Sequence, residues 1–538
     1  DLGVTLDYPS SNLSFFLVRG SPFITCSVSG TSITISTSHG VRSFSRNSST
    51  KFSANLTNNQ KWLIYASSPI NLFKDGDSFI KCRGEFTGVI RIAVLPGSNP
   101  DFITTLDRFS SCYPVSGEAD FKTPFGLEYK WEKRGSGDLL MLAHPLHLKL
   151  LSRDDRSVTV LDKIRYKSID GDLVGVVGNS WILRPDAVSV TWHSIKGVNK
   201  NSHKEIISAL VKDDDALNSS AKVTSSSYFY GKLIARAARF ALIAEEVSYL
   251  DVIPKITTYL KNMIQPWLDM GVLNRTGYFL YAIAVLAKLD PLWGERYRDK
   301  AYRLMGNVMT LGNIGDHSNS SYPRLRNFDL FKLHSWAVGL TEFWDGRNQE
   351  STSEAVNAYY SAALLGLAYG DTHLVETAST IMTLEIHTPR RCGGRRQQFQ
   401  FDHYVFFFDW QVKEGDVMYP KDFTAENRVV GVLWSTKRDS SLWFGPKEWK
   451  ECRLGIQLLP ILPVSEILFS DLQFVKQLVK WALPALHRDG VGEGWKGFVY
   501  ALESLYDKKG AIKKIQKLNK FDDGNSLSNL FWWVHSRD

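Results

Sequence analysis

Residues 231–247 read GKLIARAARFALIAEEV and decide how the second half of the chain folds. Apolar side chains recur there at helical spacing, and good helix formers follow the initial glycine. The same pattern recurs at 278–288, 355–369, 374–384, 471–486 and 497–507. Helices that pair over roughly 320 residues predict an α-solenoid or a closed α/α toroid, and the lack of a fixed-period repeat favours the toroid.

The first 215 residues follow a different pattern. Short β-branched or aromatic stretches bounded by turn residues predict strands at 14–18, 23–28, 32–36, 62–66 and 89–94. Many short strands of this kind indicate a β-sandwich. The opening of the chain resembles the middle of such a domain, so we expect the sandwich to be incomplete at its start.

Length and charge set the broad class of the protein. A chain of 538 residues exceeds what one hydrophobic core usually supports, which predicts several domains. A net charge of +8 is small for this length, whereas nucleic-acid-binding proteins concentrate their charge more densely. The basic run at 508–520 is more simply a solvated helix face, so we expect no nucleic-acid partner.

The sequence gives little information about the cellular compartment of the protein or about bound cofactors. Five widely spaced cysteines without a CxxC pair argue against a zinc ribbon and a disulfide scaffold. The longest apolar run, 278–287, is shorter than the ~20 residues of a membrane span, and no signal peptide is visible at Asp1. Six N-x-S/T sequons favour an extracellular protein, or one associated with the cell wall or plasma membrane.

The densest polar stretch runs from Arg326 into a predicted helix at residue 355. Glu350 and Glu354 lie four residues apart, so one helix face carries both if the helix reaches back that far. Like charges raise each other's pKa, as general acid–base chemistry requires. Ser351-x-x-Glu354 also fits a capping box, which needs no catalysis and is the simpler interpretation of the residues alone. Asp329 and His334 likewise fit an ordinary turn and a core histidine.

Other polar patterns are weaker. Tyr230-Gly231-Lys232 opens a helix, where a lysine opposes the dipole and favours an outside partner, although a solvated lysine is the default. His144-Pro-Leu-His147 lacks the spacing of metal ligands on a helix. No Walker A or GxSxG motif is present. We therefore expect neither a metal nor a cofactor.

Five long motifs carry a family resemblance. They read RNFDLFKLHSWAVGLTEFWDGRNQESTSEAVNAYYSAALLGLAYGD (326–371), SYFYGKLIARAARFALIAEE (227–246), ENRVVGVLWSTKRDSSLWF (426–444), KECRLGIQLLPILPVSE (450–466) and GVGEGWKGFVYALE (490–503). They resemble glycoside hydrolase family 81, the endo-β-1,3-glucanases, and most closely its plant branch, which includes the legume β-glucan elicitor-binding proteins. The resemblance covers nearly the whole chain.

The resemblance implies a β-sandwich over 1–150, a small α/β connecting part over 151–215 and an (α/α)6 barrel over 216–538. It also implies a monomer that hydrolyses β-1,3-glucan with inversion, which takes two carboxyl groups roughly 6.5–9.5 Å apart. Glu354 becomes the expected general base and Glu350 its partner, so the resemblance overrides the capping interpretation. The resemblance further places four residues along the glucan cleft: Asp329, His334, Tyr230 and Lys232.

Two internal segments depart from the family pattern. The family's general acid is an aspartate in an Asn-Asp-His-His stretch before the helix that here begins Gly277-Tyr278-Phe279. In this chain residues 273–276 read LNRT, so the acid is missing, and Asp269 is the one nearby carboxylate that can substitute. Residues 387–409 do not resemble the family either. A gene-structure error, with a lost exon and a retained intron, explains both departures, and a diverged paralogue is the alternative.

Three functions follow in order of preference. The first is endo-hydrolysis of fungal or oomycete wall glucan, or of callose. The second is a catalytically weak β-glucan-binding protein that acts in elicitor recognition. The third is a binder of nucleic acid or of an acidic surface.

Overall fold

A computed structural model of the chain describes residues 1–97, 99–152, 156–217, 226–270, 277–310, 324–339, 341–387, 410–413 and 419–537. The chain divides into two compact units. Unit 1 comprises Asp1–Arg184 with Leu330–Lys332, and unit 2 comprises Pro185–Asp329 with Leu333–Asp538. The connecting part predicted over 151–215 is therefore shared between the units. Apart from His387, the predicted insertion at 387–409 lies outside the described residues.

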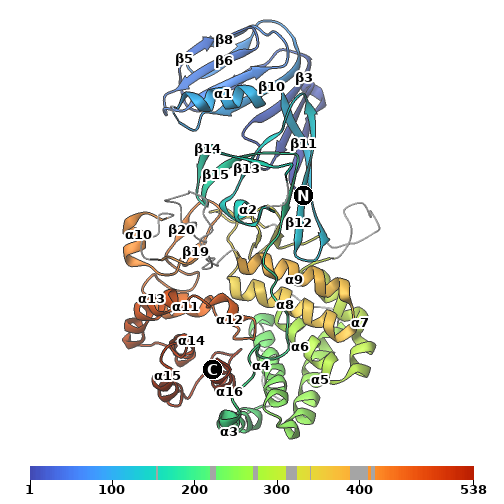
Figure 1. The fold of residues 1–538 in the computed structure, drawn as a ribbon, viewed down its shortest axis with the longest axis vertical. Coiled ribbons are helices and arrows are strands. Elements are labelled where there is room, and N and C mark those ends of the chain that lie inside the picture. The colour runs from blue at the N-terminus through green and yellow to red at the C-terminus, as the bar shows by residue number, and fades with distance from the viewer. Residues whose placement is uncertain are drawn as a thin grey trace. The chain divides into compact units, whose positions relative to one another are not determined.

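Antiparallel sheets dominate unit 1 (Figure 1). Seven strands pair in the order β1-β2-β3-β10-β7-β6-β5, and three more pair in the order β4-β9-β8. Residues from both sheets, among them Phe52 and Ile80, share one apolar core, which confirms the predicted sandwich. The strands are β1 (Gly3–Tyr8), β2 (Leu13–Val18), β3 (Ile24–Thr31), β4 (Thr34–Ser36), β5 (Val41–Arg46), β6 (Lys51–Leu56), β7 (Lys61–Ala66), β8 (Leu72–Asp75), β9 (Phe79–Cys82) and β10 (Phe86–Val94).

The rest of unit 1 adds two small sheets, ordered β11-β12-β16 and β13-β15-β14. Pairing of β12 with β16 places Tyr129 opposite Trp181, and both rings are fully buried. This pairing crosses residue 150, where the sequence suggested a domain boundary. The elements are α1 (Pro100–Phe109), β11 (Cys112–Thr123), β12 (Gly126–Gly135), β13 (Leu140–Ala143), α2 (Pro145–Leu150), β14 (Thr159–Ser168), β15 (Gly171–Val177) and β16 (Ser180–Leu183).

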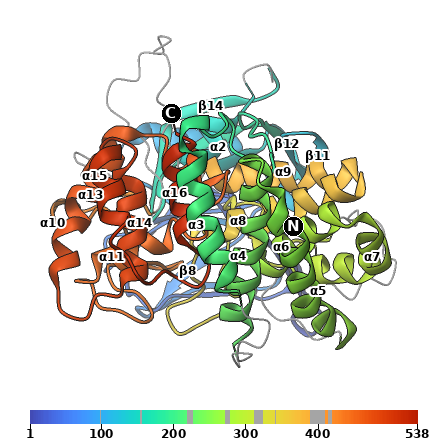
Figure 2. The ribbon, with the colours of Figure 1, turned by 90° about the horizontal axis from the view of Figure 1, so that it is seen from below.

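Unit 2 is a ring of paired helices (Figure 2). Contacts link α4 to α6, α6 to α8, α11 to α14, α14 to α16 and α16 back to α4. The ring closes between α8 and α11, where the Thr352 amide donates to Gln457 at 3.2 Å and the Ser353 hydroxyl donates to the Ile456 carbonyl at 3.0 Å. The inner helices are α4 (Ser227–Glu246), α6 (Gly277–Leu289), α8 (Thr352–Tyr369), α11 (Lys450–Ile456), α14 (Glu493–Glu503) and α16 (Leu527–His535).

A second layer of helices packs outside this ring, which confirms the (α/α)6 barrel. These helices are α3 (His203–Asp215), α5 (Ile253–Met270), α7 (Pro291–Gly306), α9 (Thr372–His387), α13 (Leu472–Ala482) and α15 (Lys508–Ile515), with the shorter α10 (Lys421–Glu426) and α12 (Ser465–Leu468) between them in sequence. The predicted helix at 471–486 ends earlier, because Pro484 cannot continue an α-helical hydrogen-bond pattern.

Burial explains why the inner helix α6 is apolar on every side, whereas the outer helix α5 is apolar on one face. All residues of α6 from Tyr278 to Ala287 are buried, whereas α5 buries one face through residues such as Ile256, Leu260 and Met263. Among the described residues, no helix combines the length and the apolar character that crossing a bilayer takes.

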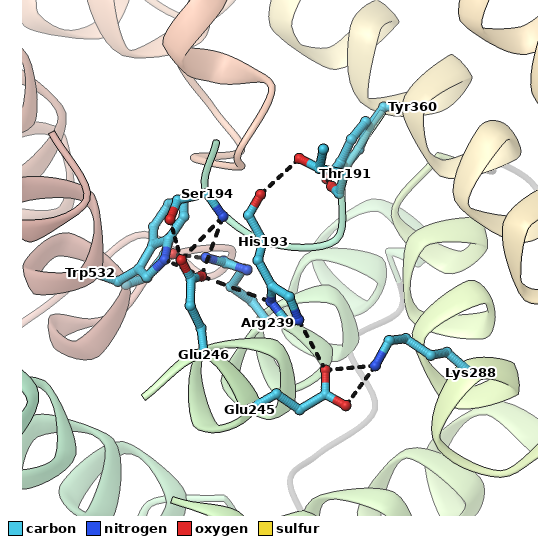
Figure 3. A network of polar contacts seen from close by, with 10 residues as sticks. Thr191, His193, Ser194, Arg239, Glu245, Glu246, Lys288, Tyr360 and Trp532 are labelled. Carbon is cyan, nitrogen blue, oxygen red and sulfur yellow. Dashed lines mark hydrogen bonds and ion pairs between the residues drawn. The ribbon is translucent and has the colours of Figure 1, made fainter. Parts of the chain in front are cut away.

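Residues 191–194 close the ring at the end where α4 finishes, and we call them the end plug (Figure 3). The Ser194 amide donates to Glu246 of α4 at 3.2 Å. Trp532 of α16 donates its indole N–H to the same carboxylate at 2.8 Å. Tyr360 of α8 donates its hydroxyl to the Thr191 carbonyl. Helices α4 and α8 thus bond the plug directly, and α16 supports it through Glu246.

A histidine in the end plug makes stability depend on pH. The His193 ring lies 3.5 Å from Glu245 and 3.8 Å from Glu246, with Lys288 and Arg239 also nearby (Figure 3). Burial lowers the pKa of His193 below its ordinary 6.5, against the pull of the two carboxylates. Below pH 6.5 the unfolded chain therefore binds a proton that the folded chain does not, so stability falls as the pH falls.

We expect the melting temperature of the wild-type protein to fall by a few degrees more than that of His193→Gln between about pH 7.5 and about pH 5.5. Thermal unfolding at both pH values measures this difference, and the comparison removes the contribution of every other titrating group. An equal loss in both proteins would show that His193 does not couple protonation to folding.

Candidate active site

A cavity of about 420 Å³ lies in unit 2 where α4, α6 and α8 begin. Its volume falls within the range of small-molecule sites. Val308, Trp336, Ala337 and Val338 provide apolar lining. The polar lining consists of Tyr228, Tyr278, Asn307, Arg326, Asn327, Ser335, Glu350, Glu354, Asn357 and Tyr359.

Glu354 is one of the two carboxylates among the described residues that line this cavity. It lies in the first turn of α8, and three hydroxyl groups donate to it. Tyr228 and Tyr278 each donate to Oε1 at 2.9 Å, and Ser351 donates to Oε2 at 3.1 Å. Such a set of donors fixes the direction in which the carboxylate points.

Burial and hydrogen bonding act on Glu354 in opposite directions. Burial raises the pKa of Glu354 above its ordinary value. The hydrogen bonds from Tyr278 and Tyr228, and the positive charge of Lys232, limit that rise. Burial also raises the pKa of both tyrosines, so they remain hydroxyl donors at neutral pH. A carboxylate whose pKa is raised by burial, while hydrogen-bond donors favour its ionised form, can accept a proton from water.

Glu350 precedes the helix rather than sharing a face with Glu354, because α8 begins at Thr352. Its backbone amide donates to the Ser335 carbonyl at 2.9 Å, and its carboxylate accepts from the Ser351 amide at 2.8 Å. Ser351 does occupy the N-cap position, but its hydroxyl donates to Glu354 and makes no capping bond. The reciprocal capping box suggested by the sequence is therefore wrong.

A third carboxylate lies beneath the cavity floor. Glu385 of α9 is completely buried and accepts from the Ser335 hydroxyl at 2.9 Å. The same hydroxyl lies 2.8 Å from that of Tyr359. Burial raises the pKa of Glu385 to about 8, and the charge of Glu350 adds to the rise. Burial therefore favours the neutral form of Glu385. Its carboxyl group accepts from Ser335, whose carbonyl accepts from the amide of Glu350.

Asp329 and His334 lie opposite each other on a short hairpin, β17 (Phe328–Asp329) and β18 (His334–Ser335). Trp336 donates its indole N–H to Asp329 at 3.0 Å, and the His334 ring packs edge-on against Trp336 with centroids 4.4 Å apart. Arg347 lies 3.9 Å from Asp329. Both predicted residues are buried and support Trp336, which itself lines the cavity.

The remaining predicted residues lie outside the described lining of the cavity. Tyr230 is buried and donates its hydroxyl to the Met263 carbonyl at 2.9 Å. Lys232 is buried and pairs with Asp522 at 2.6 Å, with its ammonium 5.3 Å from the centre of the Tyr228 ring. Asp269 is paired with Lys300 at 2.5 Å.

Sequence reasoning missed five residues that hold the carboxylates of the site: Tyr228, Tyr278, Ser335, Tyr359 and Glu385. Tyr228 stands two positions before Tyr230, and residues two apart lie on nearly opposite faces of a helix. The position of Lys232, one turn beyond Tyr228, was the available signal for the correct face. The signal for Glu385 was a single acidic residue in the otherwise apolar end of its helix, TIMTLEIH (380–387).

Comparison with known proteins shows the family of the chain. The glycosyl hydrolase family 81 N-terminal domain matches residues 1–195, and the C-terminal domain of that family matches residues 274–534. Glucan endo-1,3-beta-D-glucosidase of Glycine max is 54% identical, over 100% of this chain and 83% of that protein. Glucan endo-1,3-beta-D-glucosidase 2 of Saccharomyces cerevisiae is 23% identical, over 96% of this chain and 72% of that protein.

The fold has a solved counterpart as well. A glycoside hydrolase family 81 structure from Clostridium thermocellum superposes with a TM-score of 0.79 at 21% identity, and the match covers 99% of this chain and 76% of that one. Two family domains and a relative that spans the whole chain lead to one assignment: the chain belongs to glycoside hydrolase family 81.

Proposed function

We propose that this protein binds β-1,3-glucan and attacks its internal linkages by an inverting mechanism in which Glu354 is the general base. The observation that carries the proposal is the enclosed Glu354 carboxylate, held by three hydroxyl donors at the wall of a cavity. The names of the relatives supply the substrate class. In this role Glu354 removes a proton from water as the water oxygen bonds to the anomeric carbon.

The glycosidic bond breaks in the same step, and its oxygen leaves with the electron pair and takes up a proton. Glu350 and Glu354 are the carboxylates among the described lining residues. Both belong to the segment that we assign to the base side. We propose that the usual general acid is deleted from this chain just before Gly277. Asp269 is the one nearby carboxylate in the sequence, but its ion pair with Lys300 at 2.5 Å makes it a poor substitute.

A second function follows from that deletion. A cavity that keeps its hydroxyl, amide and aromatic lining but lacks a proton donor can bind glucan and turn it over slowly. Such a protein suits recognition of wall fragments in plant defence. We therefore propose a catalytically weak β-glucan-binding protein as the alternative. Measuring laminarin binding and the release of new reducing ends on the same preparation separates the two functions, and absence of binding contradicts both.

We also propose that the protein acts as a monomer outside the cell or at the cell wall, since the proposed ligand is a wall polysaccharide and the chain carries six sequons. Enzymatic removal of N-linked glycans from the protein purified from its native tissue tests the location, because a shift in mass requires passage through the secretory route.

Removing one donor to Glu354 is expected to shift the pH dependence of hydrolysis. Tyr278→Phe deletes a hydrogen bond that stabilises the charged carboxylate, so the pKa of Glu354 rises further. The base then requires a higher pH to ionise, and the acidic limb of the pH–rate profile moves toward neutral pH. Rates on an oligosaccharide β-fluoride, whose leaving group departs without a proton, measure this shift.

Tyr281→Phe is the matched control, because Tyr281 lies one turn along α6 and its hydroxyl is not among the described groups that donate to Glu354. We expect its profile to coincide with that of the wild type. A Tyr278→Phe profile in the same position as the control would show that the titrating base is another group.

A further inference from the structure

One hairpin of unit 2 connects the cavity to a distant exposed surface. Its base is the pair Ser335 and Glu350, joined by a 2.9 Å hydrogen bond. Its strands remain paired at Trp336 and Gln349, and its tip is a tight turn at 343–346, where Phe343 and Gly346 pair. The segment from Ser335 to Val338 lines the cavity. Six residue steps separate Glu350 from Trp344, which is at most roughly 20 Å along an extended chain.

Two similar turns present aromatic side chains beside each other at this tip. In the first turn Trp344 is 100% exposed. In the second turn, where Leu442 pairs with Gly445, Trp443 is 59% exposed and Phe444 is 50% exposed. The rings of Phe343 and Trp443 are 5.5 Å apart and join the two turns. We call Phe343, Trp344, Trp443 and Phe444 the aromatic platform.

The backbone that carries Trp344 is firmly held, so its exposure does not come from a loose loop. Lys437 pairs with the carboxylate of Asp345 at 2.8 Å, and the Thr436 hydroxyl donates to the Asp345 carbonyl at 3.0 Å. Gly346 has φ +82° and packs so closely on Ser435 that a side chain there would collide with its hydroxyl. The turn is therefore built to hold an indole out into solvent.

We propose that the aromatic platform is a second binding subsite for the β-1,3-glucan chain, distant from the cleavage point. The inference rests on the proposed function, and it adds a second surface that binds the same glucan chain. Aromatic faces stack on the weakly apolar faces of sugar rings, while the neighbouring Asp345 and Lys437 can bond to hydroxyl groups. The hairpin makes the platform continuous with the cavity, so one chain can occupy both.

The same observations favour a polysaccharide over a protein partner. A protein interface usually buries a packed centre behind a polar rim. Here the most exposed ring, that of Trp344, stands in the turn of a hairpin whose base lines the cavity.

The test compares Trp344→Ala and Trp344→Phe with Leu292→Ala, which truncates another highly exposed apolar side chain, on α7. Titration calorimetry with laminarin and with the β-1,3-linked disaccharide supplies the affinities. We expect Trp344→Ala to weaken laminarin binding about ten-fold, as loss of one stacking contact does, while Trp344→Phe retains most of it. Binding of the disaccharide, too short to reach both places, should stay within about two-fold of wild type.

Each outcome decides between the proposals. Equal laminarin affinity in wild type, Trp344→Ala and Leu292→Ala overturns the platform and leaves the proposed function standing. A wild-type protein that binds neither sugar overturns both. A wild-type oligomer that Trp344→Ala converts to a monomer, with laminarin affinity unchanged, assigns the platform to contact between two copies of the chain and also overturns the subsite.

Discussion

Replacing Glu354 by glutamine is expected to lower hydrolysis of an oligosaccharide β-fluoride by about 10²–10⁴-fold while laminarin binding changes little. Glutamine keeps the size of the side chain and one acceptor oxygen, which can still accept from Tyr228 and Tyr278, while its amide group can donate to the Ser351 hydroxyl. It cannot take a proton from water. The fluoride substrate isolates this step, because its leaving group requires no acid.

Glu376→Gln is the matched control, since Glu376 is exposed on α9. We expect it to hydrolyse the fluoride at the wild-type rate. If Glu354→Gln remains as active as this control, the base is a different group and Glu350→Gln becomes the variant to examine. If Glu354→Gln loses binding together with activity, the side chain organises the cavity rather than the chemistry.

The second large effect concerns the unmodified chain. We expect it to bind laminarin but to release reducing ends about 10²–10⁴-fold more slowly than glucan endo-1,3-beta-D-glucosidase of Glycine max, its 54% identical relative. The proposed deletion removes the proton donor, whereas the described groups that line the cavity and support Glu354 are present. Attack by water without protonation of the leaving oxygen meets most of the original barrier.

The β-fluoride again provides the diagnostic measurement. If only the acid is missing, the rate on the fluoride should approach that of the Glycine max protein, and the deficit should appear on laminarin alone. Asp269→Asn is expected to leave the slow laminarin rate unchanged, because Lys300 already holds that carboxylate. Rapid laminarin hydrolysis by the unmodified chain would contradict the prediction, and its loss in Asp269→Asn would identify Asp269 as the substitute acid.

The fold follows closely from local patterns in the sequence. The predicted helix at 278–288 corresponds to α6, Gly277–Leu289, because an apolar run of that length has to be buried on all sides. The predicted strand at 89–94 forms part of β10, Phe86–Val94. Closure of the ring was harder to predict from the sequence. It depends on contacts such as that of Thr352 with Gln457, between segments more than a hundred residues apart.

The site residues that belong to a sequence motif could be predicted, whereas those brought to the cavity only by tertiary packing could not. Glu350 and Glu354 follow from the family motif, and the structure brings both to one cavity. Whether Tyr228 or Tyr230 faces the cavity depends on how α4 is rotated about its axis, and the spacing of residues in the sequence does not determine that rotation. Glu385 approaches Ser335 across the barrel wall, and no local pattern links a residue of α9 to a strand fifty positions earlier.

The end plug limits the route that a polymer can take. Because residues 191–194 occupy the ring where α4 ends, the described part of the barrel has its cavity at one mouth and a stopper at the other. A glucan strand cannot be threaded through the ring from one side to the other. It has to lie across the open mouth, and both fragments depart from the face on which the intact strand arrived. Cutting in the middle of a strand needs such an open face, because both arms of the strand extend beyond the point of cleavage.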